Sequence, residues 1–142
     1  MNTGEILRFT GPDVEGVDVY NPTAPFMDRG RLTLAARVES HDSETDSRVM
    51  FFVERRGAWT RDTDTPVFPL QDPFICRVGD EWVTGGVRFP VGNNSWRTDF
   101  YRGPDLLHLE HFASGPLGMK DIRPVELEDG RIGVFTRPQG EK

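Results

Sequence analysis

Gly30-Arg31-Leu32-Thr33-Leu34-Ala35-Ala36-Arg37 is the stretch that decides the fold, because its pattern returns twice along the 142-residue chain. Asp80–Val87 (DEWVTGGV) begins fifty residues later, and Gly130–Arg137 (GRIGVFTR) begins fifty residues after that. Each copy is a turn followed by a run of residues that favour β-strands. A repeat of roughly 40–50 residues with several short strands per unit is typical of propeller blades. The repeat therefore predicts an all-β protein built from similar blades.

A polar residue beside an extended segment precedes each copy of the repeat. These residues are Asn21 and Asp72, each followed by a proline, and Asp121. A propeller brings the starts of its inner strands together at one mouth. We therefore expect Asn21, Asp72 and Asp121 to face one shared pocket.

The pattern of strands and turns divides the chain into units of antiparallel four-stranded sheets. We expect a first blade over about residues 16–70, a second over about 71–118, and the start of a third over about 119–142. Within them, residues 59–70 read as a connection and 106–112 as a strand. A closed propeller needs at least about four blades. The chain is therefore expected to be a single incomplete domain of about two and a half blades, although a sandwich with a coincidental repeat is an alternative.

Composition excludes several classes of function. The net charge of −6 argues against nucleic-acid binding, which needs a basic surface. The single cysteine, Cys76, can form neither a disulfide within the chain nor a zinc site built of thiolates. The N-terminus lacks the pattern of a secretion signal, and no apolar run reaches the ~20 residues of a membrane span. We expect a cytoplasmic protein that binds no metal, no cofactor, no nucleic acid and no membrane.

Asp72 is the strongest candidate for chemistry. Pro73 restricts its backbone to extended geometry, and a carboxyl held at the start of a strand can serve as a general acid in sugar chemistry. The alternative is an aspartate that caps backbone amides in a turn. Arg37 and Arg137 occupy matching positions of the repeat, where a guanidinium suits carboxylate, phosphate or sugar hydroxyls.

Several short segments together carry a family resemblance. They are Tyr20–Ala24 (YNPTA), Gly30–Leu32 (GRL), Arg37–Glu39 (RVE), Gln71–Phe74 (QDPF), Met119–Arg123 (MKDIR) and Gly133–Gly140 (GVFTRPQG). In this series the chain resembles the five-bladed propeller glycosidases, in particular the mannoside phosphorylases and β-mannosidases of glycoside hydrolase family 130. It resembles still more closely the family called domain of unknown function 1861. The resemblance implies a partial five-bladed propeller that acts on carbohydrate.

The resemblance also assigns roles to individual residues. Asp72 matches the family's general acid, while Asn21 and Arg37 match sugar-binding positions. Lys120 and Arg137 fall in the region where phosphorylases hold phosphate. Asp121 and Arg123, beside Lys120, are expected to line the same pocket.

Two departures from the glycosidase pattern bear on the reaction. Phe74 stands where the general-acid segment carries an arginine, and Thr136 stands where a histidine precedes Arg-Pro. The first departure removes an arginine and the second removes a histidine expected near phosphate, so hydrolysis or binding alone is expected rather than phosphorolysis. Three alternatives remain: a non-catalytic sugar-binding module, an interaction module, and an inactive fragment. A second chain or further C-terminal blades would complete the propeller.

Overall fold

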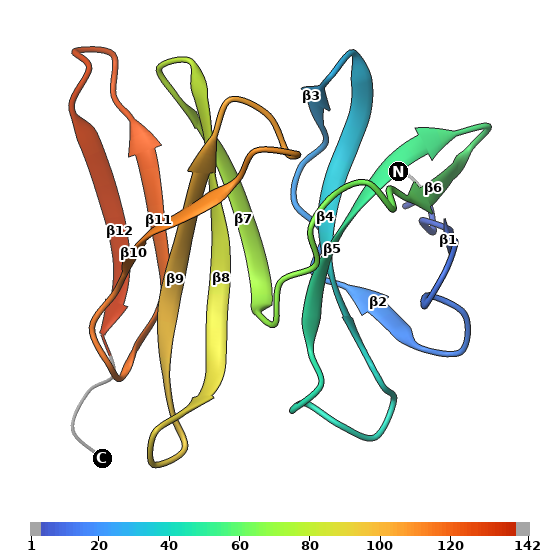
Figure 1. Cartoon of the computed structure of the whole chain (residues 1–142), viewed down its shortest axis with the longest axis horizontal. Coiled ribbons are helices and arrows are strands. Elements are labelled where there is room, and N and C mark those ends of the chain that lie inside the picture. Colours follow the sequence, from blue (N-terminus) through green and yellow to red (C-terminus); the bar gives the residue numbers. More distant parts are fainter. Residues whose placement is uncertain (1–3, 139–142) are drawn as a thin grey trace.

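The chain folds into β-strands joined by turns and loops. The computed structural model describes residues 4–138, which form twelve strands and no helix. The strands make three sheets that follow one another along the chain and across the molecule (Figure 1). The prediction of an all-β protein is therefore confirmed. Residues 139–142, the expected end of the third blade, lie outside the described residues.

The first sheet holds six strands rather than four. Its order is β1-β6-β5-β4-β2, and β3 also pairs with β4. The strands are β1 (Phe9–Thr10), β2 (Asp18–Tyr20), β3 (Phe26–Asp28), β4 (Arg31–Glu39), β5 (Arg48–Arg55) and β6 (Ala58–Arg61).

Two parts of this sheet differ from the sequence-based expectation. The sheet starts before residue 16, because β1 pairs in parallel with β6. The expected connection over 59–70 begins inside strand β6, since Trp59 is buried in the core and its strand pairs with β5. The apolar pattern of a strand this short is too brief to separate it from a loop.

The second and third sheets are antiparallel. The second has the order β10-β9-β8-β7, and the third pairs β11 with β12. The fourth strand of the second sheet begins at Glu110 rather than 106, because Leu106 turns into the core and its amide donates to Asp28. The strands are β7 (Gln71–Val78), β8 (Glu81–Val91), β9 (Ser95–Gly103), β10 (Glu110–Ser114), β11 (Met119–Glu126) and β12 (Ile132–Pro138).

The core lies on both faces of strands β4 and β5. Side chains alternate between the two faces of a strand, so neighbouring residues enter different clusters. Leu34 and Phe52 pack on one face with Trp59, whereas Ala35 and Phe51 pack on the other face. The second cluster includes Phe68, Leu70 and Leu106 and reaches Trp82 and Tyr101 of the next sheet. It therefore joins the first sheet to the second.

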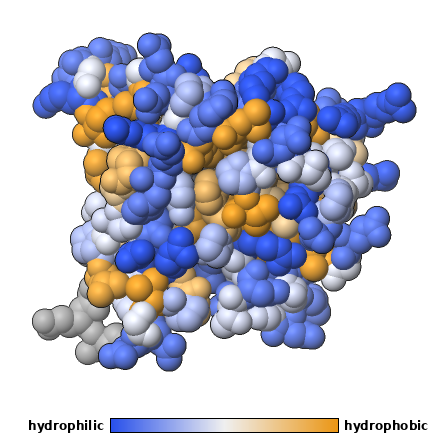
Figure 2. Space-filling model, in the orientation of Figure 1, coloured by the Kyte–Doolittle hydropathy of each residue, from blue (hydrophilic) through white to orange (hydrophobic). Residues whose placement is uncertain are grey.

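The third sheet is covered less completely than the other two. Val134 and Phe135 of β12 are 56% and 70% exposed, and Figure 2 shows apolar patches on the surface where this sheet lies. A cavity of about 640 Å³ between the second and third sheets is lined by apolar side chains that include Phe100, Phe112 and Val134. This cavity is lined by other residues than those expected around Asp72.

Two features are absent from residues 4–138, a membrane-spanning helix and a cluster of metal ligands. No helix in this part of the chain is long and apolar enough to span a membrane. Within the same range, no group of three or more His, Cys, Asp or Glu side chains could hold a metal ion.

Candidate functional site

Three residues of the repeat share an uncommon backbone conformation. Asn21, Asp72 and Asp121 have φ angles of 48°, 47° and 57°. This left-handed region is costly for most residues with a side chain, but asparagine and aspartate enter it more readily than others. The three polar residues therefore share a local geometry as well as a position in the repeat, and the expectation that Pro73 holds Asp72 in extended geometry is wrong.

The shared conformation belongs to a β-bulge, in which two residues of one strand oppose a single residue of its partner. In β7 and β11 the register shifts at this point, and in the first sheet the hydrogen bonds on either side of Asn21 show the same step. A bulge bends the strand and redirects a side chain. The bulged residues and those opposite them are Asn21 with Ala36, Asp72 with Gly86, and Asp121 with Thr136.

Gly86 allows the backbone to approach closely behind Asp72. A Cβ atom on Gly86 would lie 2.4 Å from the carbonyl oxygen of Gln71, and one on Gly85 would lie 1.9 Å from that of Asp99. Two adjacent glycines inside a strand indicate such close approach, or a bulge, and both occur here.

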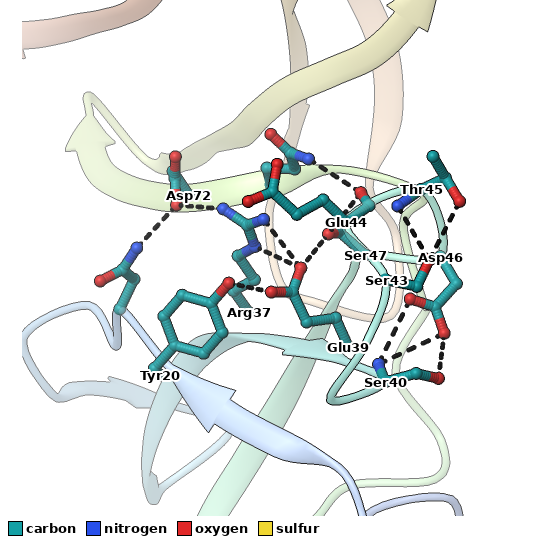
Figure 3. A network of polar contacts seen from close by, with 12 residues as sticks. Tyr20, Arg37, Glu39, Ser40, Ser43, Glu44, Thr45, Asp46, Ser47 and Asp72 are labelled. Carbon is teal, nitrogen blue, oxygen red and sulfur yellow. Dashed lines mark hydrogen bonds and ion pairs between the residues drawn. The ribbon is translucent and has the colours of Figure 1, made fainter.

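Asp72 joins the first sheet to the second. The Asn21 side-chain amide donates a hydrogen bond of 2.7 Å to Oδ1 of Asp72. Arg37 donates to the same oxygen through Nη1, at 3.2 Å. The other carboxylate oxygen points away from both donors (Figure 3), and the side chain is 31% exposed. Asn21, Arg37 and Asp72 therefore meet, with one oxygen of Asp72 turned outward.

Behind Asp72 lies a buried carboxylate, that of Glu39, which was not among the residues expected at the site. Oε2 of Glu39 accepts hydrogen bonds from Arg37 through Nε at 2.9 Å and Nη2 at 2.7 Å. Tyr20 and Ser47 donate to Glu39 as well. The side chains of Arg37 and Glu39 are each only 9% exposed. Since residues two apart in a strand share a face, the spacing of Arg37 and Glu39 is the signal that could have found the pair.

Electrostatics around Glu39 favour its charged form. Burial by itself raises the pKa of Glu39, but hydrogen bonds from Ser47, Tyr20 and Arg37 outweigh burial and hold this pKa below its usual value. Burial, with the hydrogen bond to Glu39, raises the pKa of Tyr20 to about 12. The Tyr20 ring also lies 5.1 Å from the Arg37 guanidinium carbon, within the range of a cation–π contact.

Asp121 connects to Asp72 through an arginine rather than directly. Arg137 forms an ion pair of 2.9 Å with Asp121, and Arg123 lies 3.6 Å from the same carboxylate. Arg123 also donates to the main-chain oxygen of Asp72, at 3.1 Å. Burial lowers the pKa of Arg123, although the nearby Asp121 and Asp72 oppose this effect.

Lys120 lies apart from this arginine cluster. Its ammonium group is 5.1 Å from the centre of the Trp96 ring on β9, a cation–π arrangement. The structure therefore brings Asn21, Arg37, Asp72, Asp121, Arg123 and Arg137 into one chain of contacts and sets Lys120 against the second sheet.

Comparisons with known proteins find one family model and several similar structures. A family model described as "Protein of unknown function (DUF1861)" matches residues 1–142. The structure of a hypothetical protein from Leishmania major is 37% identical to this chain, with a TM-score of 0.84, and the match covers 97% of this chain and 46% of that one. No match was found among curated proteins.

Two further structures come from Leishmania mexicana. A mannose phosphorylase in complex with a phosphate ion is 35% identical, with a TM-score of 0.85 over 98% of this chain and 44% of that chain. A GDP-Man-dependent mannosyltransferase is 34% identical, with a TM-score of 0.82 over 94% of this chain and 44% of that chain. The chain thus spans less than half the length of each of these three structures.

Proposed function

The chain belongs to the DUF1861 family, and from that membership we propose that it forms the part of a carbohydrate-active site that is built around Asp72. The observation that carries the proposal is the convergence of Asn21, Arg37 and Asp72 from two sheets. A mannose phosphorylase and a mannosyltransferase are 35% and 34% identical to this chain. This similarity supports mannose as the sugar.

In this proposal Asp72 is the general acid. Its outward oxygen carries the proton and passes it to the glycosidic oxygen as the bond to the sugar breaks. Asn21 and Arg37 hold the other oxygen, so that the carboxyl keeps one orientation.

The departures at Phe74 and Thr136 led us to expect hydrolysis, but the second reactant is proposed to be inorganic phosphate rather than water, which the similarity to a mannose phosphorylase in complex with a phosphate ion supports. Inverting hydrolysis requires another carboxylate to activate water. Among the described residues, the two carboxylates next in the network, Glu39 and Asp121, are both engaged by arginines. In phosphorolysis a phosphate oxygen attacks the anomeric carbon itself, and the products are mannose 1-phosphate and the released alcohol. Arg123 and Arg137 are the proposed phosphate contacts.

The remainder of the active site is proposed to come from additional blades, which either continue this chain or belong to a second chain. The chain covers only 44–46% of the matched structures, which supports a five-bladed propeller of which this chain forms part. The apolar side chains of Phe112 and Val134 line the cavity between the second and third sheets and are about half exposed. Further strands of the third blade would pack against them.

Binding and turnover test the proposal separately. Titration calorimetry with mannose, mannose 1-phosphate and inorganic phosphate measures binding, and release of 4-nitrophenol from aryl mannosides with and without phosphate measures turnover. Asp72→Asn is expected to retain binding and lose turnover. Asp129→Asn, on an exposed turn of the third sheet, is the matched control and is expected to change neither. Turnover by Asp72→Asn at the rate of the unmodified chain would refute the role of the acid.

A sugar-binding module without catalysis is the second candidate. The pairing of Glu39 and Asp121 with arginines favours it, because neither is left as an obvious base. Mannose binding that is weakened by Arg37→Met, with no turnover under any of these conditions, would identify this function. Absence of binding to all three ligands would refute both candidates.

A further inference from the structure

Glu39 is a buried charged group that the proposed reaction does not use. Its Oε2 atom takes two donors of the Arg37 guanidinium, Nε and Nη2, which lie along one edge of that group. Only Nη1 reaches Asp72, at the longer distance of 3.2 Å. The guanidinium is therefore divided unequally between two carboxylates.

The way in which Arg37 is shared determines whether one or both carboxylate oxygens of Asp72 accept hydrogen bonds from it. A guanidinium forms its strongest pair with a carboxylate when two parallel hydrogen bonds engage both carboxylate oxygens. Such a pair with Arg37 would occupy the oxygen of Asp72 that now points outward. Glu39 holds the Nε–Nη2 edge of Arg37, which excludes a side-on pair with Asp72, and it orients the guanidinium so that Nη1 is the group that faces Asp72.

Glu39 is itself held in place by two hydroxyl groups. Tyr20, on β2, donates to one carboxylate oxygen, and Ser47 donates to the other from the loop before β5 (Figure 3). The antiparallel register places Tyr20 directly opposite Arg37. A carboxylate with donors on both oxygens has little freedom to rotate. Glu39 therefore holds the Arg37 guanidinium in one orientation.

We propose that Glu39 is a positioning residue that turns Arg37 so that one oxygen of Asp72 stays unpaired. The effect on turnover rests on the proposed function of Asp72, whereas the effect on Arg37 does not. Glu39 touches neither sugar nor phosphate in this scheme and acts through Arg37 alone.

The first measurement follows Arg37 directly. In ¹⁵N-labelled protein, the exchange rate of the Arg37 Nε–H proton with water reports whether that edge is held, and Arg37→Lys assigns the signal. Glu39→Gln is expected to increase this rate at least about tenfold, because the carboxylate acceptor becomes a neutral amide. Tyr20→Phe keeps the charge of Glu39 and the aromatic ring, and is expected to change the rate less than about threefold. An unchanged rate in Glu39→Gln would overturn the proposal.

The second measurement separates kcat from KM for the aryl mannoside reaction. Glu39→Gln is expected to lower kcat about 100-fold with little change in KM, because a displaced acid affects the reaction more than the binding of sugar. A variant with unchanged kcat but altered Arg37 exchange would overturn the positioning role. If the unmodified chain shows no turnover and no sugar binding, the proposed function fails, while the exchange measurement still decides whether Glu39 holds Arg37.

A third variant guards against loss of folding. If Glu39→Gln no longer unfolds cooperatively, Glu39→Asp keeps the charge but shortens the side chain by one methylene, which withdraws the carboxylate from Arg37. Faster Arg37 exchange in Glu39→Asp supports the proposal, and an unchanged rate overturns it.

Discussion

Removing Arg37 should expose the cost of a buried, uncompensated charge. Arg37→Met keeps most of the side-chain volume but leaves the Glu39 carboxylate, which is 9% exposed, without its cation. Breaking a buried ion pair by removing one partner costs about 3–5 kcal/mol. Since Tyr20 and Ser47 still donate to Glu39, we expect the lower end of that range, about 3 kcal/mol. This is a large share of the roughly 5–15 kcal/mol that stabilises a typical protein.

The pH dependence of this loss has a definite sign. In the unmodified chain the pKa of Glu39 is lowered by folding, so its contribution is present above the unfolded pKa and is lost as pH falls. Without Arg37, burial has less opposition and the pKa of Glu39 should rise, so that protonation relieves the penalty. The difference in stability between the two proteins is therefore expected to narrow as pH falls from 7 to 4.

Urea unfolding at pH 7 and pH 4 measures both effects. The double variant Arg37→Met/Glu39→Gln is the matched control, and it should regain part of the stability at pH 7, because no buried charge remains unpaired. A loss below about 1 kcal/mol at pH 7, or an equal loss at both pH values, would refute this account of the pair.

Three further predictions concern other parts of the fold. Asp28→Ala is expected to lower the unfolding free energy by about 3 kcal/mol in urea, because the Trp82 indole N–H and a main-chain amide lose their buried acceptor. Gly86→Ala is expected to weaken mannose binding in calorimetry, since its Cβ would lie 2.4 Å from the Gln71 carbonyl oxygen and displace the bulge. Stability in urea is expected to fall as pH rises from about 10 towards 12, because the folded chain raises the pKa of Tyr20 to about 12.

Each of these has its own control. Asp28→Asn keeps a side-chain oxygen acceptor, and a loss as large as that of the alanine variant would contradict the role of the acceptor. Gly133→Ala meets only the side chains of Val125 and Leu127 and should change stability by less than about 0.5 kcal/mol. Tyr20→Phe should reduce the alkaline loss, and an unchanged loss would point to other groups.

Much of the fold could be predicted from the sequence because its signals are local. Alternating apolar residues and glycine turns recur at a fixed spacing, and they indicate strands wherever a strand is long enough to show a pattern. Strand β6 and the true start of β10 were missed. Trp59 and Leu106 are buried by contacts with other strands and loops, which no local pattern records.

In the candidate site, too, some features follow from local sequence and others from tertiary contacts. The sequence by itself determined an all-β chain and singled out Asn21 and Asp72 at matching points of a repeat, because turn chemistry and spacing are written in neighbouring residues. Only the tertiary structure decided that Arg37 reaches Asp72 and that Lys120 turns to Trp96. It also made Glu39 part of the site, since the register between β2 and β4 and the packing of one sheet on the next set which charges meet in the interior.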